Sequence, residues 1–279
     1  MNSMMVKAKL KNICRARNVD FNSVLRFYMY DRFIERLAVS RYRDNFILKG
    51  GFYLSTFFGV ENRTTLDIDT LIKNTIFNEL NIKKMILEII ALDIGDNSVL
   101  EFLKIEEIRE DHIYGGYRVS ISVTFENMKD RFHIDVATGD PITPEAINYD
   151  YLPIINDQPI KIMAYNMETI LAEKTETILN RAEACTRMKD YYDVYLIYKM
   201  YWKNIVKNNL INAFKNTFLN RNFKGNIKNL MHIIENSTIL KEKWNNYSKK
   251  NNYSKNIQYE EITNIIKQII NYSNLPTYL

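Results

Sequence analysis

The sequence predicts an α+β fold, with an N-terminal α/β lobe over residues 1–160 and a C-terminal helical lobe over residues 161–279. Two observations support this prediction. Segments that alternate between apolar and polar residues occur in the first half, whereas helical periodicity extends from about residue 167 almost to the end. Four of the five prolines fall between residues 141 and 159, and proline-rich, helix-poor connections are typical of boundaries between packed units.

The composition excludes several classes of protein. A length of 279 residues with 46% hydrophobic residues supports a sizeable core and excludes predominant disorder. Two cysteines and three histidines, scattered along the chain, supply neither a disulfide framework nor a zinc site. No apolar run approaches the roughly 20 residues of a membrane span, and the first residues lack the apolar stretch of a secretory signal. We therefore expect a cytoplasmic protein that does not engage a membrane.

Helices and strands are expected to alternate in the N-terminal lobe. Helical spacing of apolar residues predicts helices at 18–43, 52–58 and 76–92. Alternating residues predict strands at 66–72, 101–109, 117–126 and 131–136. Turns are expected at 114–117 and 127–130, a loop is expected at 138–144, and residues 151–159 are expected to be irregular.

Helical periodicity and positive charge characterise the C-terminal lobe. Helices are predicted at 167–181, 188–201, 204–219, 226–236 and 258–272. Residues 199–279 hold 13 Lys and Arg against 4 Asp and Glu, a net charge of +9. Aromatic residues interleave with these lysines, which favours a phosphate-rich partner such as RNA. Solvated lysine-rich helix faces, or the codon bias of an AT-rich genome, explain the same composition.

Three aspartates on predicted strands are candidate metal ligands. Asp67 and Asp69 are two residues apart on a strand, so both carboxylates point to one face. Such a pair of oxygen ligands favours Mg²⁺ or Mn²⁺, although a solvated pair at a strand edge has the same pattern. Asp135 lies in an apolar stretch, where a buried carboxylate needs a partner. His133 is interpreted as a core or sheet-face histidine that points away from Asp135.

Phosphate binding is predicted where Gly50 and Gly51 begin a helix. A helix N-terminus presents free backbone N–H groups, and glycines let a phosphate approach them closely. Hydroxyl groups one turn further along come from Ser55 or Thr56. A glycine pair alone is often only a turn, but glycine pair, Asp-x-Asp and a later strand aspartate occur in the order typical of nucleotidyltransferases.

The helical lobe contains a second set of charged candidates. Lys174 and Arg181 share one face of a predicted helix, and Asp190 and Asp193 share a face of the next. Either these groups form a charged surface that faces a catalytic cleft, or they form a network of ion pairs between the two helices. Arg187 lies beside Asp190 and would keep it ionised, which suits a general base.

The ordered segments resemble the AbiEii/AbiGii toxin family, the nucleotidyltransferase-like toxins of type IV toxin–antitoxin and abortive infection systems. The resemblance covers about residues 44–200 and rests on residues 48–51, 63–69, 134–140, 172–174 and 187–193, together with Arg181. It implies a nucleotidyltransferase core like that of DNA polymerase β, a helical C-terminal lobe, and use of Mg²⁺ (or Mn²⁺) and a nucleoside triphosphate (NTP). Relatives add nucleotides to the acceptor end of tRNA or are described as GTP-binding, and a separately encoded antitoxin restrains them.

The resemblance also implies a role for individual residues. By this resemblance, Gly50 and Gly51 would bind phosphate, and Asp67 and Asp69 would bind the metal. Lys174 would bind the triphosphate, and Asp190 would be the base or essential acid. Asp135 matches the strand acid of the family. Many members carry a small hydroxyl residue directly after the glycine pair, where this chain has Phe52 and Tyr53, so a hydroxyl must come from Ser55 or Thr56.

The leading functional hypothesis is a toxin that transfers a nucleoside monophosphate from an NTP to RNA, with the tRNA 3′ end as the expected acceptor. The catalytic residues would be Asp67, Asp69, Lys174 and Asp190, with Asp135 as a further metal ligand. One alternative is a GTP- or NTP-binding regulator that transfers nothing. Another is a small-molecule nucleotidyltransferase of the kind that modifies antibiotics, against which the basic C-terminal region argues.

Overall fold

The computed structural model describes residues 2–108 and 115–275. The chain forms two compact units. Unit 1 comprises the chain up to Gly139 together with Ile147–Ala164, and unit 2 comprises Asp140–Ala146 together with the chain from Tyr165 onward. The chain therefore passes between the units three times, because a short segment of unit 2 precedes the last two strands of unit 1.

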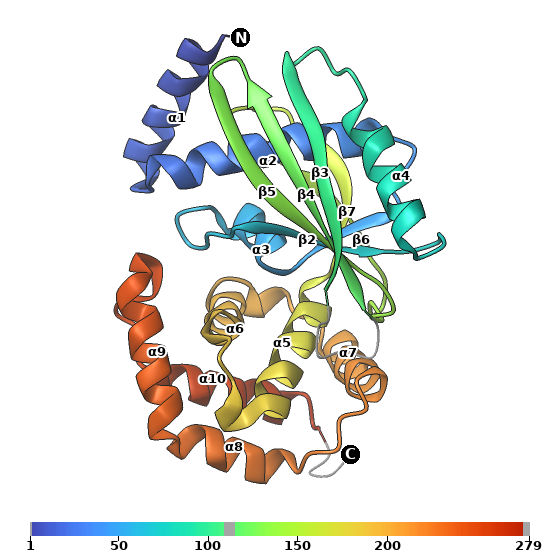
Figure 1. Cartoon of the computed structure of the whole chain (residues 1–279). Helices are drawn as coiled ribbons and strands as arrows, with labels where there is room; N and C mark the ends of the chain where they lie inside the picture. Colours follow the sequence, from blue (N-terminus) through green and yellow to red (C-terminus); the bar gives the residue numbers. More distant parts are fainter. Residues whose placement is uncertain (1, 109–114, 276–279) are drawn as a thin grey trace. The chain divides into compact units, whose positions relative to one another are not determined.

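A seven-stranded sheet forms the centre of unit 1 within the described residues (Figure 1). Its strands are β1 (Phe46–Lys49), β2 (Asp67–Ile72), β3 (Ser98–Ile108), β4 (Gly116–Phe125), β5 (Met128–Ala137), β6 (Ile147–Tyr151) and β7 (Ile160–Ala164). They lie in the order β3-β4-β5-β2-β1-β7-β6. The pairs β2–β5 and β1–β7 are parallel, and the other neighbouring pairs are antiparallel. The strand that carries Asp67 and Asp69 is therefore the central one.

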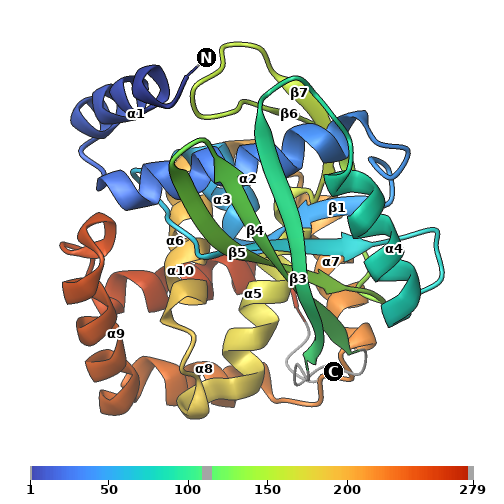
Figure 2. The same cartoon turned by 45° about the horizontal axis from the view of Figure 1, so that its top comes forward.

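Three helices of unit 1 pack against this sheet, and the helix Ser3–Arg17 packs against the helix Phe21–Val39. The helix Phe21–Val39 crosses the strands in both views (Figures 1 and 2). The helices described in this unit are α1 (Ser3–Arg17), α2 (Phe21–Val39), α3 (Gly50–Phe58) and α4 (Glu79–Ile90). Three of them begin at a polar residue whose side chain accepts a backbone N–H, namely Asn2, Asp20 and Asn78. Such caps satisfy donors that the first helical turn leaves unpaired.

Aromatic packing shows that α2 and α3 cover the same face of the sheet. The ring centroid of Tyr30 in α2 lies 5.5 Å from that of Phe52 in α3 and 5.0 Å from that of Phe132 in β5. Side chains alternate between the two faces of a strand. Because Phe132 faces these helices, Asp135 in the same strand faces the other way. The opposite face of the sheet is thus the polar one.

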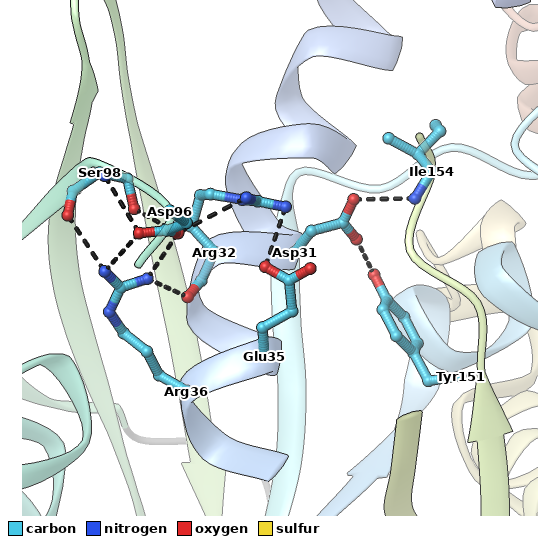
Figure 3. A network of polar contacts seen from close by, with 8 residues as sticks. All are labelled: Asp31, Arg32, Glu35, Arg36, Asp96, Ser98, Tyr151 and Ile154. Carbon is cyan, nitrogen blue, oxygen red and sulfur yellow. Dashed lines mark hydrogen bonds and ion pairs between the residues drawn. The ribbon is translucent and has the colours of Figure 1, made fainter. Parts of the chain in front are cut away.

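A network of buried polar groups fastens α2 to other parts of unit 1 (Figure 3). Arg36 donates to both carboxylate oxygens of Asp96 at 2.9 Å, just before β3. Asp31 accepts hydrogen bonds from the Tyr151 hydroxyl and, at 2.8 Å, from the backbone N–H of Ile154. Side chains of α2 are therefore tied both to the start of β3 and to the end of β6.

Helices are the regular secondary structure of unit 2 within its described residues. Its helices are α5 (Met167–Arg181), α6 (Met188–Tyr201), α7 (Lys207–Asn220), α8 (Ile227–Asn236), α9 (Thr238–Lys250) and α10 (Tyr259–Tyr272), with short 3₁₀ turns at Ala182–Ala184, Trp202–Asn204 and Asn252–Ser254. α5 contacts α6, α7 and α8. α10 buries Ile262, Ile266 and Ile269, spaced so that they share one helix face. No helix in the described part of the chain is long and apolar enough to cross a membrane.

The predicted mixture of strands and helices is confirmed, and α5 and α6 have the predicted bounds of 167–181 and 188–201. The predicted loop at 138–144 is confirmed, but β6, which lies between this loop and the segment expected to be irregular, was not predicted. β6 is a polar edge strand whose residues are exposed or half-buried apart from Tyr151, so it lacks an apolar signal. The helices α1 and α9 were not predicted, because polar and basic residues dominate both.

The turns of the N-terminal lobe also differ from prediction. The turn expected at 127–130 lies instead at Glu126 and Asn127, since β4 ends at Phe125 and β5 begins at Met128. This hairpin is therefore tighter than predicted. The predicted turn at 114–117 and the predicted strand end at 109 fall partly outside the described residues.

Candidate active site

The glycine pair lies at the junction of β1 and α3, against the side chain of Asp69. Gly50 has a φ of +62°, which L-residues with side chains rarely adopt, and a Cβ there would collide with the Asp69 carboxylate. The backbone N–H of Gly51 donates to Asp69 Oδ2 at 3.1 Å. A Cβ on Gly51 would lie 2.8 Å from Arg63 Nη2. Gly50 thus requires glycine, because its backbone has a positive φ and passes directly beside Asp69, whereas the close contact at Gly51 is with the end of a flexible arginine side chain.

Asp67 and Asp69 point to the same face of β2, as predicted from their spacing, and both are half-buried. One oxygen of Asp69 is engaged by the start of α3. Among the described residues, the Asp67 carboxylate makes no hydrogen bond or ion pair. The helix N-terminus and the Asp-x-Asp carboxylates, which are 16 residues apart in the chain, are therefore brought together.

Five charged residues face one another across five adjacent strands of the sheet, and we call them the charged row. The register places Lys49 opposite Asp69, Asp69 opposite Asp135, Asp135 opposite Arg118, and Arg118 opposite Glu106. Directly opposite residues of neighbouring strands point to the same face. The row thus places two aspartates side by side in its middle, with a cationic residue on either side of them.

Asp135 is held by Arg118 through two hydrogen bonds. Arg118 Nε lies 2.8 Å from Asp135 Oδ1, and Nη2 lies 2.7 Å from Oδ2. The Asp135 side chain is 14% exposed and that of Arg118 is 36% exposed. The hydrogen bonds to Asp135 raise the pKa of the Arg118 guanidinium. The expected partner of the buried aspartate is therefore an arginine on the neighbouring strand, a residue that sequence reasoning did not single out.

The fit of a divalent cation can be judged from the donor groups that are present. A small cavity of about 20 Å³ is lined by Asp69 and Asp135 together with Lys49, Thr70 and Gly116, among others. A cavity of roughly 10–15 Å³ is enough for one water-sized species. No group of three or more His, Cys, Asp or Glu in the described residues is arranged to hold a metal ion. Carboxylate oxygens on one face suit a divalent cation chemically, and metal binding by Asp67, Asp69 and Asp135 stays a prediction.

His133 lies on the same face as Asp135, so the interpretation that it points away is wrong. Residues two apart on a strand share a face. The register places His133 opposite Asp67 on one side and opposite Ser120 on the other. Its Nδ1 lies 3.0 Å from the Ser120 hydroxyl oxygen. The imidazole therefore extends the polar face beside the charged row.

The hydroxyl groups of α3 already have partners in the helix itself. Ser55 is fully buried, and its hydroxyl donates to the carbonyl oxygen of Gly51 at 2.7 Å. The Thr56 hydroxyl donates to the carbonyl oxygen of Tyr53 at 2.9 Å. A role of Ser55 in phosphate binding stays a prediction, and its buried position does not favour it.

The charged candidates of the helical lobe form a buried network within unit 2. Lys174 Nζ in α5 lies 2.8 Å from Asp190 Oδ1 and 2.6 Å from Asp193 Oδ2, both in α6. Arg187 Nε lies 2.8 Å from Asp190 Oδ2. Burial alone would raise the pKa of Asp190, but the charges of Lys174 and Arg187 hold it well below its usual range. Ion pairs thus join the two helices, and catalytic roles for Lys174 and Asp190 stay predictions.

Two solved structures from Helicobacter pylori are similar to this one. The first, described as a candidate nucleotidyltransferase, has 14% sequence identity and a TM-score of 0.50, with 91% of this chain and 96% of that chain covered. The second, JHP933, has 12% identity and a TM-score of 0.50, with 90% and 91% covered. At such low identity the likeness shows the fold alone. No curated protein matches the sequence.

A family model described as nucleotidyl transferase AbiEii toxin, type IV TA system, matches residues 32–262. The matched span is most of the 279-residue chain. It includes the glycine pair, the charged row and the buried network of unit 2. The resemblance inferred from the residues is confirmed, and the chain belongs to the AbiEii family of nucleotidyltransferase toxins of type IV toxin–antitoxin systems.

Proposed function

We propose that this toxin transfers a nucleoside monophosphate from an NTP to RNA, with the 3′ end of tRNA as the acceptor, in a reaction that depends on Mg²⁺. Membership of the family supports nucleotidyl transfer and a cognate antitoxin. The observation that carries the proposal is the contact between the N-terminus of α3 and the Asp-x-Asp carboxylates, in which Gly51 N–H and Asp69 Oδ2 are 3.1 Å apart.

The polar face of the sheet offers complementary groups for a metal-bound triphosphate. Asp67 and Asp69 would hold the divalent cation, which supplies charge neutralisation for the phosphates and activation of the attacking 3′-hydroxyl. Gly50 and Gly51 place no side chain over the first turn of α3. A phosphate oxygen would take over the Gly51 N–H that donates to Asp69 Oδ2, and the positive end of the helix dipole favours that anion. The reaction would form a bond between the RNA 3′-oxygen and the α-phosphorus of the NTP and release pyrophosphate.

The resemblance assigns binding of the triphosphate to Lys174 and the role of base or essential acid to Asp190. Asp190 is well suited to remain ionised, because Lys174 and Arg187 stabilise its charge. Both residues already take part in ion pairs within unit 2. A loss of activity on their substitution must therefore be compared with a loss of stability before it is assigned to chemistry.

Labelling of RNA tests the proposal directly. Purified protein is incubated with total RNA, Mg²⁺ and each α-³²P-labelled NTP in turn, and label in RNA is measured. Asp67→Asn is expected to lower the labelling rate by at least about a hundredfold, because the metal contribution to such transfers amounts to several kcal/mol. Asp150→Asn is a matched control, since Asp150 is an exposed strand aspartate paired with Lys161 at 2.9 Å.

Each outcome of this assay has a defined meaning. Label that depends on Asp67, survives Asp150→Asn and falls on a tRNA band supports the proposal as stated. Absence of label with every NTP, in protein shown to be folded, contradicts the proposed activity. Thermal stabilisation by an NTP without any product would then favour a nucleotide-binding regulator. The bidentate pairing of Asp135 with Arg118 favours this second function, because it occupies a carboxylate that is a candidate metal ligand.

A further inference from the structure

Arg118 neutralises the Asp135 carboxylate, which is 14% exposed, by forming hydrogen bonds to both of its oxygens. We propose that Arg118 is an exchangeable internal cation of the active site. It holds Asp135 in place while the site is empty, and it moves from the carboxylate to the triphosphate when an NTP arrives with its divalent cation. This inference rests on the proposed function and adds a positioning residue that couples nucleotide binding to metal binding.

The empty site needs a cation at this position. Asp69 and Asp135 are directly opposite each other on neighbouring parallel strands, and Asp67 lies two residues away on the same face. Like charges in such positions destabilise a sheet. The 14% exposure of the Asp135 side chain limits screening by water.

The position of Arg118 suits an exchangeable contact. Its side chain is 36% exposed, and its hydrogen bonds within the described residues go to Asp135 alone. The planar guanidinium binds the oxygens of carboxylate and phosphate in the same bidentate geometry. Arg118 can therefore leave Asp135 for a triphosphate oxygen without losing the kind of contact that it makes.

Arg36, in the same unit, shows the contrasting case of a fixed arginine (Figure 3). Its side chain is 3% exposed. It donates to both oxygens of Asp96 at 2.9 Å, to the Arg32 carbonyl oxygen at 2.9 Å and to the Ser98 carbonyl oxygen at 3.0 Å. Displacement of Arg36 would break four hydrogen bonds at three residues, whereas displacement of Arg118 would break only the two to the carboxylate that a metal could take over.

The cavity beside Asp69 and Asp135 supports the proposed movement of Arg118. It has about 20 Å³, room for one water-sized species, and Asp69 and Asp135 both line it. A divalent cation that enters without nucleotide competes with Arg118 for Asp135. A cation that enters with a triphosphate meets no such competition, because the phosphates give Arg118 a new partner. Nucleotide and metal should therefore strengthen each other's binding, and this coupling is reciprocal.

Binding of Mn²⁺ in the absence of nucleotide tests the first half of the proposal. Free and bound Mn²⁺ are distinguished by electron paramagnetic resonance during titration of the full chain. Arg118→Gln is expected to bind Mn²⁺ roughly tenfold more tightly than the wild type, since a competing cation has been removed. The double variant Arg118→Gln/Asp135→Asn should lose this gain, because the gain depends on the released carboxylate.

Arg131→Gln is the matched control. Arg131 lies four residues before Asp135 on β5, on the same face, and is exposed. Its substitution removes the same charge without releasing Asp135, so the affinity for Mn²⁺ should change by less than about twofold. Arg118→Lys serves as a second variant. It keeps the charge but not the bidentate geometry, and it should give an affinity between those of the wild type and Arg118→Gln.

Repetition of the titration with a non-hydrolysable NTP analogue tests the second half. The analogue should tighten Mn²⁺ binding in the wild type, and this coupling should shrink in Arg118→Gln. The proposal is overturned if Arg118→Gln binds Mn²⁺ no more tightly than Arg131→Gln, or if neither protein binds Mn²⁺ at all. RNA labelling is a separate readout, so failure of the proposed transfer with the expected Mn²⁺ results would leave the role of Arg118 standing.

Discussion

Asp31 is a carboxylate with no exposed surface, and it makes the stability of unit 1 depend on pH. Burial raises the pKa of Asp31 from its ordinary value of 3.8 to about 7, although Arg32, the Tyr151 hydroxyl and the Ile154 N–H lower it. The folded state therefore binds a proton at pH values where the unfolded chain has released it. The stabilisation that this provides is complete below about pH 4 and is lost as the pH rises through about 7.

Asp31→Asn isolates this effect, because an amide does not titrate. The free energy of unfolding of the wild type, relative to that of Asp31→Asn, should fall by up to about 4 kcal/mol between pH 4 and pH 8. Urea denaturation at intervals of one pH unit measures the two curves. A difference between wild type and variant that stays constant over this range would show that Asp31 does not titrate there.

Glycine and aspartate positions in the active site were predictable because their residue types carry the chemistry. Gly50 and Gly51 mark a helix start at which the backbone of Gly50 tolerates only glycine, and the spacing of Asp67 and Asp69 places both on one face. Arg118 was not predictable in the same way, because an arginine on a strand has many possible partners. Its role follows from the register of the strands around it.

At the scale of elements, Lys174 joins α5 to α6 inside unit 2. It is 9% exposed and lies between Asp190 and Asp193, which are 2% and 0% exposed. Lys174→Met would leave two buried carboxylates without this cation. We expect a loss of about 3–5 kcal/mol in the free energy of unfolding, the usual cost of removing one partner from a buried ion pair.

Chemical denaturation of the full chain measures this cost, and Lys199→Met supplies a matched control within unit 2. Lys199 pairs with Glu261 at 2.8 Å, but these side chains are 46% and 40% exposed. Its loss should cost much less, because water screens an exposed ion pair. Equal effects of the two substitutions would mean that the network in α5 and α6 is not important for stability, and would strengthen the case for a purely catalytic Lys174.

The hairpin of β4 and β5 shows why part of the site could not be predicted. The predicted four-residue turn at 127–130 would place Ser122 opposite Asp135, whereas the observed turn at Glu126 and Asn127 places Arg118 there. Glu126 adopts a φ of +49°, a conformation in which glycine or asparagine is expected. Because a glutamate is unusual there, the sequence did not indicate a turn at this position. A shift in a turn changes every cross-strand pair of its hairpin.

Helices of unit 2 were easier to predict than the strands of unit 1. The bounds of α5 and α6 follow from apolar residues with helical spacing, which is a local property of the sequence. The polar edge strand β6 and the basic helix α9 carry weaker patterns, and contacts with distant parts of the chain determine them. The local sequence pattern therefore predicts individual helices and strands, whereas the pairing of β2 with β5 is known only from the three-dimensional structure.

At the scale of the whole molecule, the path of the chain between its two units predicts where it can be cut. Unit 1 is completed only by β7, which pairs with β1 on one side and β6 on the other. A fragment of residues 1–160 lacks nearly all of β7, whereas a fragment of residues 1–164 contains it. We expect cooperative urea unfolding for the longer fragment and none for the shorter one. Similar unfolding curves for the two would show that β7 is dispensable.

The late position of β7 has a consequence for the newly made toxin. All five strands of the charged row have been synthesised by Ala137, but Ile47 and Leu48 of β1 find their partners Met163 and Ala164 only after a detour through Asp140–Ala146. During that interval a nascent chain displays an apolar strand with one row of unpaired amide groups. Such edges invite pairing with other chains. Nascent chains on neighbouring ribosomes are thus most prone to aggregate just before β7 leaves the ribosome.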